Sequence, residues 1–454
     1  MRTYLEARKD RRAFVRRGVA VICLVLGGAA AAAAQTGTME LVNPRSSLED
    51  QFGSSLAVSG DGGTILVGAP TGTIGGLLDV GRAYVYSRQG GPATAELSIP
   101  AAQTPKAGDR FGSSVALSAD GTVALVGAQD RNNGRGAFET FELQGGTWTW
   151  TGEVAGTAAN AALFGSALAL SADGLTAVVL APSEFSINSY AGAAYVYTRS
   201  PSGPWTPAGH LTALPADQGS MISIALSRDS GTIAAGVQTG CGFDFNCGSV
   251  YVFDRDGGAW TRQAHLTASD PIGDMNFGLA ISLSADGRTA AFGTYSGWGA
   301  YVFERSGSTW TEVQKIRFEV PDFSGQQVAL SEDGQSLVVG AASTQPGTGE
   351  IDLFTRTATG WVKRLTIPDL VDQQGAAFGK ILALSGDGSV AAVTAPFAVR
   401  PGAGNFGKAY VVAIAASVVD TPTLGVPGLA ALAVLLAAAG AFVLRRRALA
   451  NPSE

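Results

Sequence analysis

One stretch of the chain sets the pattern for most of the rest: Phe111-Gly-Ser-Ser-Val-Ala-Leu-Ser-Ala-Asp-Gly-Thr-Val-Ala-Leu-Val-Gly-Ala128. From Ser114 to Ser118, small or polar residues alternate with apolar ones, which is typical of a strand with one buried face. Ala119-Asp120-Gly121 then turns the chain, because glycine adopts positive φ without a steric penalty. Thr122 to Val126 returns through residues that favour strands. The stretch therefore predicts a β-hairpin.

This hairpin occurs seven times. Other copies begin at Phe52, Phe164, Phe277 and Phe378, and looser copies begin at Gly219 and Phe323. The aspartates of the seven turns lie about 54 residues apart on average, at Asp61, Asp120, Asp173, Asp229, Asp286, Asp333 and Asp387. A period near 50 residues indicates a β-propeller or another repeat array.

Each repeat continues with two further strands. A variable loop leads to an aromatic strand: Ala83-Tyr-Val-Tyr86, Ala194-Tyr-Val-Tyr197, Val250-Tyr-Val-Phe253 and Ala300-Tyr-Val-Phe303. A glycine-rich turn then leads to a strand that often opens with tryptophan: Trp148, Trp205, Trp260, Trp310 and Trp361. Four strands per repeat is the size of one propeller blade. We predict an all-β, seven-bladed propeller over residues 35–416.

The two ends of this region predict how the ring closes. The last copy has three strands and ends at Tyr410-Val-Val-Ala-Ile414, whereas residues 37–43 precede the first hairpin, where other repeats hold a fourth strand. We infer that the N-terminal segment completes the last blade. Main-chain hydrogen bonds would then close the ring and remove an exposed strand edge.

Several hairpins resemble a known repeat. Phe52-Gly53 with Gly68-Ala69-Pro70 is similar to the FG-GAP repeat, the blade of integrin alpha-chain propellers and of many bacterial surface proteins. Imperfect copies are Phe164-Gly165 with Leu180-Ala181-Pro182, and Phe378-Gly379 with Thr394-Ala395-Pro396. The fourth and sixth copies depart most, with Gly219-Ser-Met in place of Phe-Gly and an interruption at Phe323-Ser-Gly325. The resemblance covers roughly residues 38–416 and implies a binding or adhesion module.

The N-terminus predicts export. Residues 1–34 combine a basic segment, a short apolar core from Val19 to Leu26, and Ala32-Ala33-Ala34 before Gln35, as in a signal peptide. Asp10-Arg-Arg-Ala-Phe-Val-Arg16 also resembles a twin-arginine signal, so the export route stays open between that system and the general one.

The C-terminus predicts a membrane anchor. Val426 to Leu444 is almost wholly apolar, and nineteen helical residues span roughly 28 Å, about one bilayer core. Arg445, Arg446 and Arg447 follow, and such a cluster stays cytoplasmic, which leaves the propeller outside. Residues 417–425 form the linker, and residues 445–454 a basic cytoplasmic tail.

The linker also resembles a sorting signal. Pro422, Thr423 and Leu424, followed by an apolar helix and an arginine cluster, resemble the IPTL-type sorting signals of Gram-negative bacteria, although Thr421 stands where that family has Ile. The resemblance implies a membrane protease as a partner. Whether the helix is then retained or cleaved stays open.

Composition and motifs give little sign of catalysis or of a cofactor. With a net charge of −6 and no basic stripe, nucleic acid is not expected as a partner. The two histidines, His210 and His265, hold equivalent repeat positions and are expected to serve the blade. Each turn offers one aspartate, too few for a calcium ion, so we expect no metal and no cofactor. Cys241 and Cys247 are predicted to form a local disulfide, which export would permit.

The loops between the second and third strands depart most from the repeat, and loops on a regular scaffold often carry function. The candidate ligand-contacting residues are Arg131, Arg135, Phe185, Tyr190, Phe243, Asp244, Tyr295 and Trp298. The recurring tryptophans are expected to pack against the neighbouring blade. We predict a non-enzymatic binding or adhesion module outside the cytoplasmic membrane, with an unidentified protein or glycan as its ligand. The alternatives are a structural surface protein and a carbohydrate-active enzyme.

Overall fold

The fold is known from a computed structural model, which describes residues 37–45, 50–157, 162–186, 189–190, 192–212, 219–240, 246–295, 299–317, 324–342, 349–371, 375–399 and 407–414. All of them belong to one compact unit, Met1–Ala415. The predicted signal peptide, linker, apolar helix and basic tail lie outside the described residues. Within the described ranges, no helix is long and apolar enough to cross a bilayer.

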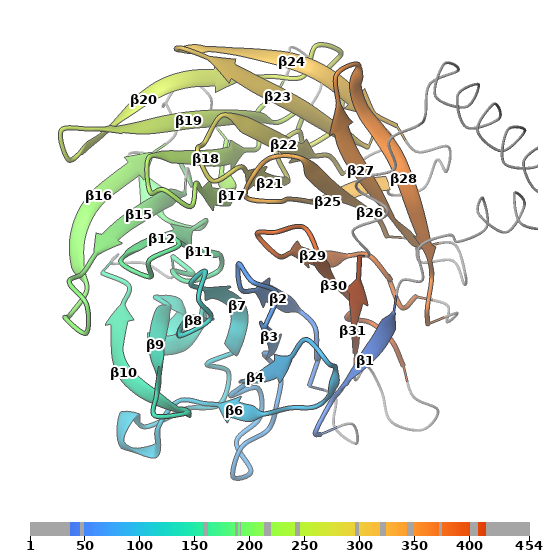
Figure 1. Cartoon of the computed structure of the whole chain (residues 1–454). Helices are drawn as coiled ribbons and strands as arrows, with labels where there is room; N and C mark the ends of the chain where they lie inside the picture. Colours follow the sequence, from blue (N-terminus) through green and yellow to red (C-terminus); the bar gives the residue numbers. More distant parts are fainter. Residues whose placement is uncertain are drawn as a thin grey trace, which may run out of the picture. The chain divides into compact units, whose positions relative to one another are not determined.

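The chain folds into a seven-bladed β-propeller, as the repeats predict (Figure 1). In each blade the first strand of the repeat lies innermost, and successive strands pair antiparallel. The blades are β2 (Ser55–Val58), β3 (Thr64–Ala69), β4 (Arg82–Ser87) and β6 (Ala95–Leu97); β7 (Phe111–Leu117), β8 (Val123–Ala128), β9 (Ala137–Gln144) and β10 (Thr147–Ala155); β11 (Leu168–Leu170), β12 (Thr176–Ala181), β15 (Ala193–Thr198) and β16 (Thr206–Thr212); β17 (Met221–Leu226), β18 (Thr232–Val237), β19 (Ser249–Asp256) and β20 (Ala259–Leu266); β21 (Ala280–Leu283), β22 (Thr289–Gly293), β23 (Ala300–Ser306) and β24 (Thr309–Ile316); β25 (Ser324–Leu330), β26 (Ser336–Ala341), β27 (Glu350–Thr357) and β28 (Gly360–Pro368); and β29 (Ile381–Leu384), β30 (Val390–Ala395) and β31 (Lys408–Ala413) with β1 (Thr38–Val42).

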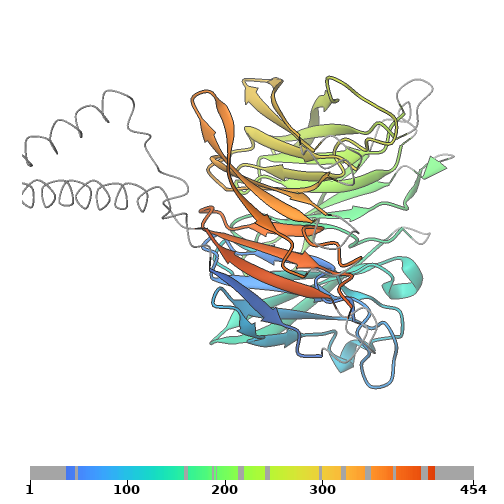
Figure 2. The same ribbon diagram turned by 90° about the vertical axis from the view of Figure 1, so that its right-hand side faces the viewer.

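The N-terminal strand closes the ring, as predicted. β1 pairs antiparallel with β31, with Thr38 opposite Val412 and Leu41 opposite Ala409, and both views show the two strands side by side (Figures 1 and 2). A second contact was not anticipated. The short strand β5 (Gly91–Pro92), from the first blade, pairs parallel with Leu41 and Val42 on the other edge of β1. The closing strand is therefore held between the last and the first blade.

Every hairpin turn repeats one hydrogen-bond pattern. In the second blade, Ser118 Oγ donates to Asp120 Oδ1 at 2.6 Å, and the Thr122 amide donates to the same oxygen at 3.0 Å. The Val123 amide donates back to Ser118 Oγ at 3.0 Å. The equivalent serine and aspartate do the same in the other six blades. The turn aspartates therefore accept hydrogen bonds from their own turns.

The glycines of the FG and GAP motifs meet across blades. Ser114 Oγ of the second blade donates to the carbonyl oxygen of Gly165, the FG glycine of the third, at 2.6 Å. A Cβ atom on Gly127 would overlap that same oxygen. Gly68 with Gly112, Gly236 with Gly278, and Gly340 with Gly379 repeat the contact. At the closure, Thr394 Oγ1 donates to Gly53 O at 2.8 Å, so the seventh and first blades join at the same place.

The hydrophobic core lies between neighbouring blades. One cluster joins Phe138 of the second blade to Phe164 and Val179 of the third, with Trp205 packed against it. The Trp205 ring lies 5.9 Å from the Phe138 ring, and its Nε1 donates to Thr140 Oγ1 at 2.9 Å. The tryptophans thus pack against the preceding blade, which confirms that prediction.

Deleting residues 37–43 should lower the melting temperature of the protein by many degrees, because it exposes one edge of β31 and leaves the core beside Leu41 open. Thermal unfolding followed by circular dichroism would measure the effect. A protein lacking only residues 1–36 is the control and should melt like the full-length chain. An equal melting temperature for both truncations would contradict the role of β1.

Gly127→Ala should destabilise the propeller by about 1–3 kcal/mol or more, because the added methyl group overlaps the Gly165 carbonyl in a packed contact. Chemical denaturation would measure the loss. Gly152→Ala is the matched control in the same blade, since a Cβ atom there meets nothing within 4 Å. Similar losses for the two variants would show that the interblade contact is not the cause.

Candidate functional site

The two faces of the propeller differ in their connections. All seven connections between the first and second strands have five residues, and these turns lie on what we call the tight-turn face. The connections between the second and third strands emerge on the opposite face, the loop face, because neighbouring strands are antiparallel. They range from six to twelve residues: 70–81, 129–136, 182–192, 238–248, 294–299, 342–349 and 396–407. The loop face is therefore where the repeats differ.

The described part of the chain includes five of the predicted ligand-contacting residues. Arg135 is exposed, and the side chain of Tyr295 is also on the surface, at 44% exposure. Phe185 and Tyr190 face each other as backbone partners in a small ribbon formed by β13 (Phe185–Ser186) and β14 (Ser189–Tyr190). The fifth, Arg131, is buried. Phe243, Asp244 and Trp298 lie outside the described residues, as do the linker and tail residues Pro422, Thr423, Leu424, Arg445, Arg446 and Arg447.

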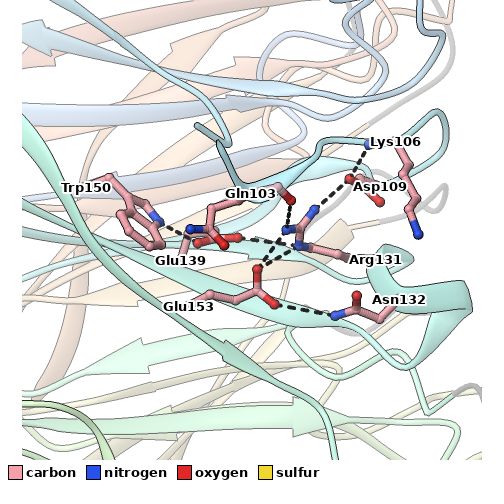
Figure 3. A network of polar contacts seen from close by, with 8 residues as sticks. All are labelled: Gln103, Lys106, Asp109, Arg131, Asn132, Glu139, Trp150 and Glu153. Carbon is pink, nitrogen blue, oxygen red and sulfur yellow. Dashed lines mark hydrogen bonds and ion pairs between the residues drawn. The ribbon is translucent and has the colours of Figure 1, made fainter. Parts of the chain in front are cut away.

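Arg131 is at the centre of a buried network that joins the 129–136 connection to β10 and to the connection between the first and second blades (Figure 3). It lies in α2 (Arg131–Gly134), and its side chain is 6% exposed. Its Nη1 donates to Asp109 Oδ2 at 2.9 Å, and its Nη2 donates to Glu153 Oε2 and to the carbonyl of Gln103, both at 2.8 Å. Arg131 therefore holds the shape of the loop face, and its guanidinium group is not displayed to solvent.

Glu139 lies against this network and is fully buried. Its Oε2 accepts a hydrogen bond from Trp150 Nε1 at 2.6 Å, whereas its Oε1 lies 3.6 Å from Arg131 Nε and has no hydrogen-bond partner. Burial raises the pKa of Glu139 to about 8, and the nearby Glu153 carboxylate adds to the rise. Glu139 is therefore largely protonated at neutral pH. Such a shift is common at functional sites, but this carboxyl group faces the core.

Exposed apolar side chains gather on the loop face. Among the described residues, five of the ten large hydrophobic side chains at the surface belong to these connections: Leu77, Leu78, Tyr295, Phe397 and Val399. A sixth, Ile272, lies between β20 and β21, in a connection from a fourth strand to the next first strand, which emerges on the same face. The two leucines stand on a small hairpin in which the Ile74 and Leu77 amides each donate to the other's carbonyl. The described parts of the five-residue turns carry none of these side chains. The loop face is thus the less polar of the two.

The histidines occupy equivalent places and stack on tyrosines of the adjacent strand. His265 lies on Tyr251 with ring centroids 4.5 Å apart, and His210 lies on Tyr195 at 4.6 Å. In the third blade Glu184 joins the pair, accepting from Tyr195 Oη at 2.6 Å and lying 3.2 Å from His210 Nε2. These hydrogen bonds lower the pKa of Glu184 despite its partial burial. The prediction that both histidines serve the blade is confirmed.

The structure describes only part of what is needed to test the predictions about metal ions and about the disulfide. Within the described ranges, no three His, Cys, Asp or Glu side chains are placed to hold a metal ion. Cys247 is buried, at 3% exposure. Cys241 lies outside the described residues, so the Cys241–Cys247 bond stays a prediction.

Three ion pairs join neighbouring blades, and the sequence analysis did not predict them; together we call them the ion-pair belt. Arg199 Nη1 of the third blade lies 2.6 Å from Glu142 Oε1 of the second, and Arg356 pairs with Glu304 of the preceding blade at 2.7 Å. Arg305 of the fifth blade and Asp254 of the fourth form a third pair of this kind, in which two guanidinium nitrogens donate to the two carboxylate oxygens. The signal was an arginine two residues after the last aromatic residue of the third strand in five repeats: Arg88, Arg199, Arg255, Arg305 and Arg356. Its partner could not be read from one repeat alone, because the acid lies in another blade.

Glu139→Gln should make the protein more stable than the parent above pH 8, by an amount on the order of 1–3 kcal/mol, because the amide never ionises in the buried site. The carboxyl group has its ordinary pKa of 4.5 in the unfolded chain and about 8 in the folded one, so folding takes up a proton between these values. Parent stability therefore falls as pH rises through this window.

The measurement is the melting temperature of both proteins from pH 5 to pH 9. The melting temperature of Glu139→Gln should exceed that of the parent by a growing amount as pH rises. Glu142→Gln, which alters an acid of the ion-pair belt, is the control. Its difference in melting temperature from the parent should not grow in the same way as pH rises. A constant difference between Glu139→Gln and the parent at all pH values would contradict the buried, protonated state.

Comparison with known proteins agrees with this architecture. Residues 41–86 match the family model described as FG-GAP repeat. The propeller domain of Cps50 (Swd1) from Myceliophteria thermophila is similar with 11% identity and a TM-score of 0.52, covering 80% of this chain and 96% of that one. That likeness supports the fold alone. Two putative 6-phosphogluconolactonases are also similar, one from Bacteroides uniformis (17% identity, TM-score 0.48, 73% of this chain and 88% of that one) and one from Bacteroides fragilis (15% identity, TM-score 0.49, 73% and 86%).

No curated protein matches the chain. The matched segment runs from the end of β1 through β4, so it holds the first FG hairpin and the aromatic strand after it. The other blades repeat the same turn, and four of the seven joints between blades hold the same contact between glycines. The chain is therefore a seven-bladed β-propeller in which residues 41–86 match the FG-GAP repeat.

Proposed function

We propose that this protein is an exported, membrane-anchored binding or adhesion module whose loop face contacts a protein or glycan outside the cytoplasmic membrane. The observation that carries the proposal is the contrast between the two faces. The turns of one face have the same length and hydrogen bonds in all seven blades. The connections of the other face differ in length and, among the described residues, hold six of the ten exposed large hydrophobic side chains. A fold that repeats its scaffold and varies one face is suited to recognition.

The path of the chain supports the same assignment of faces. The Ala413 amide donates to the carbonyl of Gly37 at 3.0 Å, and the Ile414 amide donates to Ser389 in a five-residue turn at 2.7 Å. Both ends of the described propeller therefore emerge beside the tight-turn face. A tether that continues the chain beyond Ile414 starts on the side opposite to the loop face. The signal-like N-terminus and the apolar segment with its arginine cluster support export and anchoring.

Two exposed residues allow the proposal to be tested with little damage to the fold. Arg135→Ala combined with Tyr295→Ala removes a charge and an aromatic ring from the loop face. Arg255→Ala combined with Val313→Ala removes a charge and an apolar side chain from exposed positions outside that face. Full-length protein in detergent would be screened on glycan and protein arrays with both double variants.

We expect binding by the parent to weaken at least fivefold in the loop-face variant and to persist in the control. Equal weakening in both variants would contradict the choice of face. If the parent bound nothing on a broad array, a structural surface protein would become the better description.

A further inference from the structure

The propeller encloses a central cavity of about 250 Å³. Its wall is formed by the innermost strand of every blade, from β2 to β29, each of which pairs with a neighbour on one edge only. The free edges present main-chain amide and carbonyl groups toward the axis, so the cavity suits water and small polar groups. The residues at one end of this cavity belong to the hairpin turns.

A closed circle of main-chain hydrogen bonds surrounds that end. The residue before each turn aspartate lies on this circle: Gly60, Ala119, Ala172, Arg228, Ala285, Glu332 and Gly386. The carbonyl oxygen of each residue accepts a main-chain hydrogen bond of 2.8 to 3.3 Å from the preceding blade. The donor is either the amide of the equivalent residue in that blade or the amide of the turn aspartate that follows it. The seventh bond runs from the Asp387 amide to Gly60 O and completes the circle. The blades are therefore fixed close together at the tight-turn face.

Five of these seven positions are glycine or alanine, and the other two hold long, oppositely charged side chains. Arg228 Nε lies 3.2 Å from Glu332 Oε1, although the two residues belong to the fourth and sixth blades. Arg228 Nη1 also donates to the carbonyl of Leu117 in the second blade at 3.2 Å. The pair thus spans the inside of the circle and links blades that are not neighbours.

The small residues opposite make room for this pair. A Cβ atom on Gly386 would overlap the Glu332 carboxyl group, and one on Gly60 would lie 3.0 Å from Glu332 Oε1. Together the two side chains contact the first, second, fourth, sixth and seventh blades. The other three positions of the circle, Ala119, Ala172 and Ala285, hold methyl side chains that are too short to reach the axis.

We propose that the Arg228–Glu332 ion pair closes the central channel at the tight-turn face, so that small polar solutes enter the channel only from the loop face. The channel is then a blind pocket behind the face assigned to recognition, with a guanidinium and a carboxylate group as its floor. This inference refines the access route at the proposed binding face. Its test needs no ligand, so it can fail or succeed separately from the proposed function.

The test uses a cysteine at Ala57, a residue of the cavity wall, in the full-length protein. The probe is 2-aminoethyl methanethiosulfonate, and the measurement is the rate at which Ala57→Cys is modified. Tyr295→Cys, on the exposed loop face, gives the rate without a barrier. We expect Ala57→Cys to react at least tenfold more slowly than Tyr295→Cys, and Arg228→Ala with Glu332→Ala to raise the Ala57→Cys rate at least fivefold.

Asp254→Ala with Arg305→Ala is the matched control, because it removes an interblade ion pair away from the channel. It should leave the Ala57→Cys rate within twofold of the parent. An unchanged rate after removal of Arg228 and Glu332, or an equal rise in the control, would overturn the closure. No reaction at Ala57→Cys in the parent would overturn access from the loop face. If the double variant does not fold, Glu332→Gln, which keeps the size of the side chain and weakens its contact with Arg228, takes its place with the same expected direction.

Discussion

The contact between glycines of adjacent blades is the constraint on which the ring depends. At four of the seven joints, the carbonyl of an FG glycine lies where a side chain on the preceding blade's GAP glycine would be, so the two blades pack closely there. A serine hydroxyl group satisfies that buried carbonyl in the first, second and fourth blades. At the closure, Thr394 takes the place of the GAP glycine and donates the hydrogen bond itself. The FG-GAP motif is thus an interblade joint and not a feature of one blade.

This joint separates the parts of the protein that must repeat from those that are free to differ. The hairpin turns carry the aspartate pattern and the circle of main-chain hydrogen bonds, so their length cannot change without breaking both. Some connections on the loop face share main-chain hydrogen bonds near their ends, such as the bond from the Phe111 amide to the carbonyl of Val80, but the lengths of these connections differ by a factor of two. Variation is therefore confined to one side of the disc, and that side is the one available for recognition.

Electrostatics follow the same division. On the tight-turn side, opposite charges meet across blade boundaries, as in the pairs of Arg199 with Glu142 and Arg356 with Glu304. Toward the loop face, charge is buried within a blade, where Arg131 holds Asp109 and Glu153 together beside the protonated Glu139. The cost of removing the charges from water offsets much of the attraction within such buried pairs. The network stiffens the base of the loops, while Arg135 and Tyr295 stay at the surface.

The sequence by itself determined the number of blades, the strands within each and the closure by residues 37–43, because these follow from local patterns repeated seven times. It also assigned the turn aspartates, the tryptophans and the histidines to the scaffold, since a residue present at one repeat position in several blades serves the blade. Only the tertiary structure showed that Arg131 is buried, that β5 holds the closing strand, and that Arg228 meets Glu332 across the axis. Each of these contacts joins residues that no local pattern links, and their distance in space is set by the curvature of the ring and not by their spacing along the chain.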